Sequence, residues 1–206
     1  MYKNLTSYLS FLSKQRFRKI GYLLLFLCLG FTTTQASHIV GGEITYEYVT
    51  GTTYRFTLKL YRDCSGIGLG TTQTLRLSPT SSGSTFTVTR TSLTDISILC
   101  PGQTSTCAGG STPGVEEHIY QGNVNLVALP PGQSYTISYE TCCRNGIITN
   151  ISVPSNAGIY VSTLLDPNLT PSNNSPEFLN APYTVIEAGQ LASISPNGFD
   201  PDGDNL

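Results

Sequence analysis

The residues of this sequence best suited to chemistry are its cysteines, and five of them follow residue 36: Cys64, Cys100, Cys107, Cys142 and Cys143. Cysteine thiolates bind zinc, but structural zinc sites usually combine C-x-x-C pairs with further cysteines or histidines. This part of the sequence contains no C-x-x-C pair, and its two histidines, His38 and His118, are 80 positions apart. In an exported chain such cysteines predict disulfides instead.

Side-chain alternation indicates one cysteine pair, because successive residues of a strand point to opposite faces. Cys143 continues the apolar face of residues 135–139, and Cys64 continues the apolar face of residues 56–60. Both cysteines would then face the core at the end of a strand. We therefore predict the disulfide Cys64–Cys143.

The remaining cysteines allow a second pair and leave alternatives open. Cys100 and Cys107 flank a loop rich in Gly, Ser and Thr, and we predict that they close it. Cys142 would stay unpaired, or would replace Cys143 if the strand bulges there. A vicinal Cys142–Cys143 bond is the third and most strained alternative.

Three alternating aspartates, Asp200, Asp202 and Asp204, end the sequence in the string DPDGDNL. Carboxylates this close repel one another unless water or a cation lies between them, and Ca²⁺ prefers such oxygen ligands. Asn205 stands where an EF-hand loop needs glycine, and the distal glutamate is missing. The aspartates therefore predict either a solvated acidic turn or an incomplete calcium site, whose other ligands would come from residues beyond Leu206.

Catalytic interpretations of the sequence are weak, and we predict that the chain is not an enzyme. The string IVGG at residues 39–42 resembles the activated N-terminus of trypsin-like proteases. However, His118 is the only histidine that follows it, and the sequence lacks the motifs that carry the protease triad. Glu116 and Glu117 are adjacent, so on a strand they point to opposite faces and cannot flank one glycosidic bond. We interpret IVGG as the start of a strand and the glutamates as a solvated pair.

The first 36 residues resemble a secretory leader. Basic residues between Lys14 and Lys19 precede an apolar run, Ile20–Phe31, and small residues follow it. Twelve residues of helix rise about 18 Å, which is too short for a hydrocarbon core of about 30 Å. We predict cleavage after Ala36 and a secreted or cell-surface protein. Leu27 before Cys28 does not fit a lipoprotein signal.

The part after residue 36 carries all 13 acidic residues and 6 of the 11 basic ones, so its formal charge is −7. Nucleic-acid binding needs clustered Lys and Arg, and this composition argues against it. The abundance of Ser, Thr, Gly and Tyr suits an extracellular β protein.

Eight or nine short strands are predicted between residues 38 and 165, separated by regular turn signals. The clearest are residues 44–48 and 54–60, which alternate apolar and polar side chains and read as a hairpin. Residues 95–100 and 146–152 are two further predicted strands. This pattern is typical of an all-β, immunoglobulin- or fibronectin-III-like antiparallel sandwich, and we assign that domain to residues 37–166.

The segment from Leu129 to Asn145 is central to this fold prediction. It begins with the turn Pro130–Gly132, and Tyr135 follows three residues later. In immunoglobulin-like sandwiches a tyrosine so placed bonds back to nearby backbone, so we predict that Tyr135 is a buried tyrosine corner.

Proline, asparagine and serine dominate residues 167–182, which predicts a stiff polar linker. A new β pattern begins at residue 183 and runs to residue 206. We interpret residues 183–206 as the truncated start of a cadherin-like or immunoglobulin-like module.

The strings SHIVGGEITYEY, LYRDCSG, PGVEEHIYQG and YETCCRN together resemble the start of large multidomain surface proteins of Bacteroidota. The resemblance covers residues 37 to about 165. It implies gliding-motility-associated proteins exported through the type IX system, with immunoglobulin-like, PKD-like or cadherin-like repeats. The expected role is then a non-enzymatic structural or adhesion module, whose partners are neighbouring modules or extracellular surfaces. The alternative is a glycan-binding accessory domain of a polysaccharide-degrading system.

Overall fold

The computed structural model describes residues 38–79, 84–127, 133–146, 148–166, 172–180, 189–191 and 193–206. All of them belong to one compact unit, Ala36–Leu206. The predicted leader, residues 1–36, lies outside the described residues.

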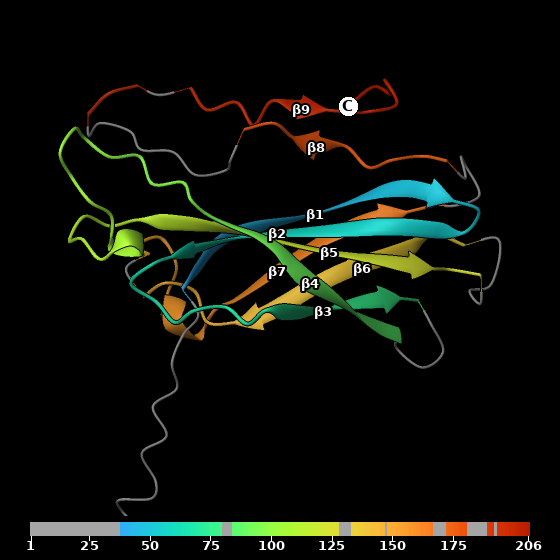
Figure 1. Cartoon of the computed structure of the whole chain (residues 1–206), viewed down its shortest axis with the longest axis horizontal. Coiled ribbons are helices and arrows are strands. Elements are labelled where there is room, and N and C mark those ends of the chain that lie inside the picture. Colours follow the sequence, from blue (N-terminus) through green and yellow to red (C-terminus); the bar gives the residue numbers. More distant parts are fainter. Residues whose placement is uncertain are drawn as a thin grey trace, which may run out of the picture. The chain divides into compact units, whose positions relative to one another are not determined.

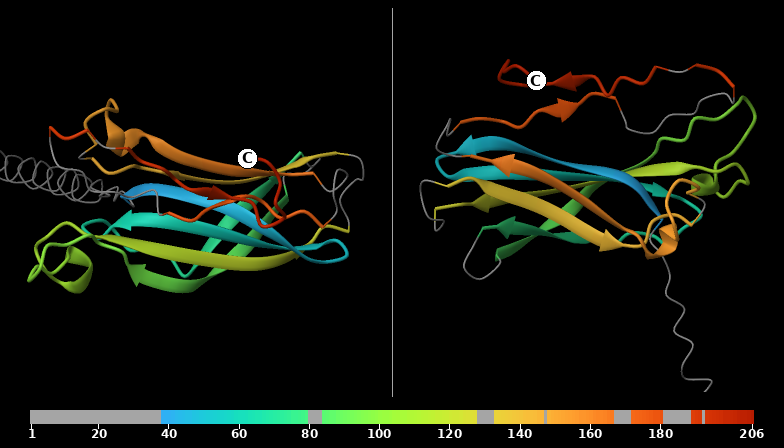
Figure 2. Two further views of the ribbon diagram at one scale, coloured as in Figure 1. Left: turned by 90° about the horizontal axis from the view of Figure 1, so that it is seen from above. Right: turned by 180° about the vertical axis from the view of Figure 1, so that it is seen from behind.

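Seven antiparallel strands form one continuous sheet (Figure 1). They are β1 (Ile39–Thr50), β2 (Thr53–Asp63), β3 (Thr72–Ser78), β4 (Ser84–Asp95), β5 (Val115–Asn125), β6 (Tyr135–Cys142) and β7 (Gly158–Leu165). Their order across the sheet is β1-β2-β5-β4-β3-β6-β7. The sheet curls until its two edge strands approach each other, and Ile39 bridges to Arg144 just after β6. The result is a nearly closed, barrel-like sandwich, which confirms the predicted all-β fold (Figure 2).

The hairpin of β1 and β2 follows directly from the sequence. Gly51 adopts φ +59° in the turn, a left-handed value that glycine reaches at little cost. Tyr54 and Phe56 lie on the buried face of β2, as the alternation predicted. Gly42 lies in β1 opposite Leu60, where an added Cβ would come within 2.9 Å of the Lys59 carbonyl oxygen. The IVGG string therefore belongs to a strand and permits close strand approach, as interpreted.

The core fills the inner face of the curled sheet with aromatic and aliphatic side chains. Phe56, Leu58, Leu60, Val88 and Ile137 are fully buried. Burying each such side chain stabilises the fold by about 1.5–3 kcal/mol relative to exposure.

Two predicted strands do not form. The chain leaves β4 after Asp95, and residues 96–100 run as irregular backbone. The described residues of 146–152 form bends and turns. Both stretches are short apolar runs, which periodicity alone cannot distinguish from loops that bury a few side chains. Two single-turn 3-10 helices occupy the loops, η1 (Thr106–Ala108) and η2 (Pro154–Asn156). No helix in the described part of the chain is long and apolar enough to cross a membrane.

The predicted linker is more ordered than its composition suggests. Its described part contains β8 (Glu177–Phe178), which pairs with β9 (Gly198–Phe199) to form a separate two-stranded sheet. Just before β8, the Ser175 amide donates to the Tyr46 carbonyl oxygen at 2.9 Å. The boundary predicted at residue 182 therefore separates two strands that pair with each other.

Candidate functional site

A cluster of four ionisable side chains occupies one end of the sheet interior: Arg62, Arg90, Glu116 and His118. We call it the interior charge cluster. Arg62 occupies an inward position of β2, and Glu116 and His118 occupy inward positions of β5. The other inward residues of these two strands are apolar, aromatic or glycine. Burying a charged group destabilises the fold unless the group is paired and hydrogen-bonded, so the partners of each side chain decide whether the cluster is stable.

Glu116 is the centre of this cluster. Its Oε1 accepts a hydrogen bond from Arg62 Nε at 2.6 Å, and it contacts His118 Nε2 at 2.5 Å. The Arg62 and Glu116 side chains are 9% and 12% exposed, and that of His118 is 1% exposed. Our interpretation of Glu116 and Glu117 as a solvated pair was therefore wrong for Glu116. Glu117 occupies the opposite face of β5, as predicted.

Arg90 joins the cluster from β4, beside a β-bulge. The register of β4 against β5 shifts between Arg90 and Ser92, which leaves Thr91 as the extra residue. Arg90 then directs one guanidinium nitrogen to His118 Nδ1 at 3.3 Å. Tyr120 follows on β5, where its hydroxyl lies 3.4 Å from the same ring nitrogen.

The glycine-rich loop after β2 supplies backbone carbonyl groups to the cluster. Arg62 donates to the Gly66 carbonyl, and Arg90 donates to the Leu69 carbonyl at 3.3 Å. The Tyr120 hydroxyl donates to the Gly70 carbonyl at 2.9 Å. The loop therefore covers the charged end of the interior and accepts hydrogen bonds from three of its side chains.

Burial and pairing set the protonation states of the cluster. Burial by itself would raise the pKa of Glu116, but hydrogen bonds from Arg62 and His118 outweigh it and hold the pKa below its ordinary value. Burial lowers the pKa of His118 even though Glu116 opposes this shift. Neutral His118 then donates from Nε2 to Glu116 and accepts from Arg90 at Nδ1. Each of the four side chains therefore has at least one hydrogen-bonding partner within the protein.

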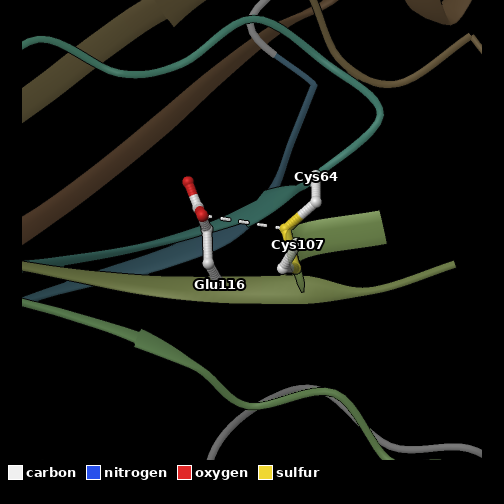
Figure 3. Close-up of side chains that lie close together, drawn as sticks. All are labelled: Cys64, Cys107 and Glu116. Atoms are coloured by element: carbon white, nitrogen blue, oxygen red, sulfur yellow. Dashed lines mark hydrogen bonds between the residues drawn. A yellow bond between two sulfur atoms is a disulfide. The ribbon is translucent and has the colours of Figure 1, made fainter. Parts of the chain in front are cut away.

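A disulfide adjoins the cluster and joins Cys64, just after β2, to Cys107 in η1 (Figure 3). The Cys64 sulfur lies 3.7 Å from Glu116 Oε2. Within the described residues, these three side chains are the one group of Cys, His, Asp or Glu whose ligand atoms gather closely enough for a metal ion. Because both sulfurs are in a disulfide, neither is a thiolate that could bind a metal ion. The disulfide instead attaches the loop that precedes β5 to the end of β2.

The predicted disulfides Cys64–Cys143 and Cys100–Cys107 are both wrong. Cys64 pairs with Cys107, Cys142 pairs with Cys143, and Cys100 is free and exposed. Because residues 96–100 do not form a strand, the loop folds back and η1 brings Cys107 to the end of β2. Strand β6 ends at Cys142, and Cys143 adopts φ +94°, so the face alternation stops before Cys143.

Tyr135 is buried, as predicted, at 1% exposure. Its hydroxyl accepts a hydrogen bond from Gln133 Nε2 at 3.1 Å. The predicted backbone partners, Leu129–Gly132, lie outside the described residues. Most other described tyrosines are also buried, namely Tyr46, Tyr54, Tyr61, Tyr120 and Tyr139, and all of these but Tyr61 belong to the core cluster.

The three C-terminal aspartates form a turn whose contacts come from the protein itself. Asp200 Oδ1 accepts from the amides of Asp202 and Asp204, at 2.8 and 3.4 Å. Both carboxylate oxygens of Asp202 accept from Asn174, at 2.6 Å from its amide and 2.8 Å from its side chain. Calcium at this position stays a prediction.

A pocket of about 350 Å³ lies between the outer face of the sheet and the segment that contains β8. We call it the junction pocket. Its floor is formed by outward side chains of β1, β2 and β5, and its wall by Asn174, Ser175, Glu177 and Pro201. Neither wall nor floor was predicted as a site.

The interior charge cluster was also missed, although the sequence contains a signal for it. Arg62, Glu116 and His118 stand at positions where the alternation of their strands calls for apolar residues. Charged residues at inward positions indicate a buried ionic network when partners lie on neighbouring strands.

Comparisons with protein-family models, with curated proteins and with solved structures found no match.

Proposed function

We propose that this chain is a non-enzymatic, exported module of the cell surface, structural or adhesive, at the N-terminal end of a larger repeat protein. The resemblance to multidomain surface proteins of Bacteroidota, exported through the type IX system, suggests this role. It agrees with the predicted leader and with the acidic, disulfide-containing composition.

One observation carries the proposal: the segment after the sandwich is attached to strand β1 by a specific set of hydrogen bonds. The amide of Tyr46 donates to Ser175 Oγ at 2.8 Å, and the Ser175 amide donates back to the Tyr46 carbonyl. The amide of Tyr48 donates to Asn174 Oδ1 at 2.8 Å. Asn174 also binds Asp202, so β9 is tied to the same point.

This attachment has two consequences that suit a module in a series. It satisfies backbone groups of an edge strand, which would otherwise be open to pairing with another chain. It also fixes the direction in which the chain continues from the sandwich. A junction of fixed geometry suits one module of an extended series.

The disulfide, the interior charge cluster and the buried tyrosines support the same structural role. The Cys64–Cys107 disulfide and an ionic network reinforce the sandwich, and five tyrosines belong to its core cluster. An aromatic platform for glycans would need tyrosines in a row on the surface. Among the described tyrosines, Tyr160 is exposed at 59% and Tyr48 is half-buried.

Surface display is the direct test. Antibodies against the folded chain should label intact cells of the source organism, and protease added to those cells should remove the signal. Replacing the leader residues 1–36 by a single methionine should abolish labelling while the protein still accumulates inside the cell. Labelling only after cell lysis would refute the proposal.

The rigid junction can be tested separately by NMR relaxation of the exported chain. Amides of β8 and β9 should report the same rotational correlation time as amides of β1. The pair of substitutions Asn174→Ala and Ser175→Ala should shorten the correlation time of β8 and β9, while Ser172→Ala, on the same segment, should not. Independent motion in the unaltered chain would contradict the observation on which the proposal rests.

A further inference from the structure

We propose that the junction pocket binds a neutral saccharide unit and is the adhesive site of this module. The inference rests on the proposed surface role, since it names the class of ligand that the module would hold. Its volume, about 350 Å³, is near the lower end of the range for small-ligand pockets, about 300–1,000 Å³. That space suits a small ligand rather than a protein segment.

The floor of the pocket is a regular array of hydrogen-bonding side chains. Thr45, Thr57 and Gln121 lie in one row across β1, β2 and β5. Gln121 Nε2 donates to Thr57 Oγ1 at 3.1 Å, which orients the amide and directs its oxygen away from that hydroxyl. In the adjacent row, Lys59 lies opposite Ile119.

Lys59 is held in place by the carboxylate beside it. Its Nζ lies 3.0 Å from Glu43 Oε1, and the Glu43 side chain is largely buried. An ammonium group fixed in this way can still donate to a ligand oxygen, because it has three protons. It presents little net positive charge, since Glu43 neutralises it.

The wall is formed by residues that the junction positions. Asn174 and Ser175 are fixed to β1 by the hydrogen bonds described above, and Glu177 and Pro201 complete the lining. Ile119 on the floor and Pro201 on the wall provide apolar contact. The pocket thus combines hydroxyl, amide and charged groups with two apolar patches.

This combination favours one ligand class over three others. An anion would meet the carboxylates of Glu47 and Glu177, whereas for a cation Glu47 is already paired with Arg55 and the Lys59 ammonium group has no lone pair to offer. An apolar ligand would leave the threonine and glutamine groups without partners, which costs about 1–3 kcal/mol for each group. A neutral sugar ring has many hydroxyls and an apolar C–H face, and so can use both the hydrogen-bonding side chains of the floor and the apolar contacts of Ile119 and Pro201.

The proposal can be tested by NMR titration of the exported chain with glucose, galactose, mannose, xylose and N-acetylglucosamine, and with glucuronate as the charged comparison, each at millimolar concentration. At least one sugar should shift the amide signals of Thr45, Thr57 and Gln121. Gln121→Ala should weaken that binding about tenfold, the effect of about 1.4 kcal/mol. Thr45→Trp, which fills the pocket, should abolish it.

Asn123→Ala is the matched control, because Asn123 lies on the same strand and the same face but outside the pocket lining. It should leave sugar binding unchanged, and the dispersion of all spectra verifies folding. The proposal is overturned if no sugar shifts the floor amides, if only glucuronate does so, or if Gln121→Ala and Asn123→Ala have equal effects. Failure here would leave surface labelling of cells unaffected, so the two proposals can fail independently.

Discussion

Arg62 and Glu116 lie directly opposite each other in the paired strands β2 and β5, and their side chains form an ion pair inside the sheet. The pair shares its carboxylate with His118 and adjoins the Cys64–Cys107 disulfide. Breaking a buried pair by removing one charge is strongly destabilising, because the remaining charge stays buried without compensation.

Glu116→Gln should therefore lower the free energy of unfolding by about 3–5 kcal/mol, as measured by urea denaturation. Glu140→Gln is the control, since Glu140 is on β6 with 69% of its side chain exposed. It should change stability by less than about 0.5 kcal/mol. Equal effects of the two substitutions would show that the interior charge cluster is not structural.

Stability should fall as the pH falls below about 6.5. The pKa of His118 is lower in the folded protein than its ordinary value of 6.5, so the unfolded chain binds more protons below that pH. The lowered pKa of Glu116 acts in the same direction, and its contribution is lost as pH falls below its ordinary value of 4.5. Chemical denaturation at several pH values between 4 and 8 measures the free energy of unfolding as a function of pH. His118→Gln should reduce the slope of this dependence between pH 6.5 and 5. An unchanged curve would contradict the assignment.

Peptide mapping without reduction should recover Cys64 linked to Cys107, Cys142 linked to Cys143, and a free Cys100. Replacing Cys64 and Cys107 together by alanine should cost about 4 kcal/mol, because the bond closes 43 residues of chain. Cys100→Ser should change stability little, since that thiol is exposed. A peptide that contains Cys64 and Cys143 would restore the pairing predicted from alternation.

Tyr135→Phe should destabilise the sandwich by about 0.5–1.5 kcal/mol, because it removes the hydrogen bond between the Tyr135 hydroxyl and Gln133 Nε2. Tyr160→Phe is the comparison, since that hydroxyl is on an exposed side chain. Thermal unfolding of both variants gives the difference. If the two midpoints move equally, the tyrosine-corner analogy fails.

Calcium should bind this chain weakly or not at all. The carboxylates of Asp200 and Asp202 already accept hydrogen bonds from backbone amides and Asn174, and a cation would have to displace some of them. Titration calorimetry of the calcium-free protein tests this. Saturable binding, with a calcium-dependent rise in melting temperature that Asp202→Ala removes, would show that the turn is a complete site.

The strands could largely be predicted from the sequence, because alternation is a local property. The apolar face of β2, the turn at Gly51 and the buried position of Tyr135 depend on residues within a few positions of each other. The outward Glu117 followed from the same rule. Such features need no knowledge of which strands are neighbours.

The tertiary structure decided every feature that joins distant residues. Cys64 pairs with Cys107 because the irregular loop between β4 and β5 folds back onto the end of β2. The alternation of side chains along a strand says nothing about the path of such a loop. Glu116 is buried because strand order places Arg62 and Arg90 on either side of β5. The junction pocket exists because Ser175 pairs with Tyr46, 129 residues earlier, and no local pattern records that contact.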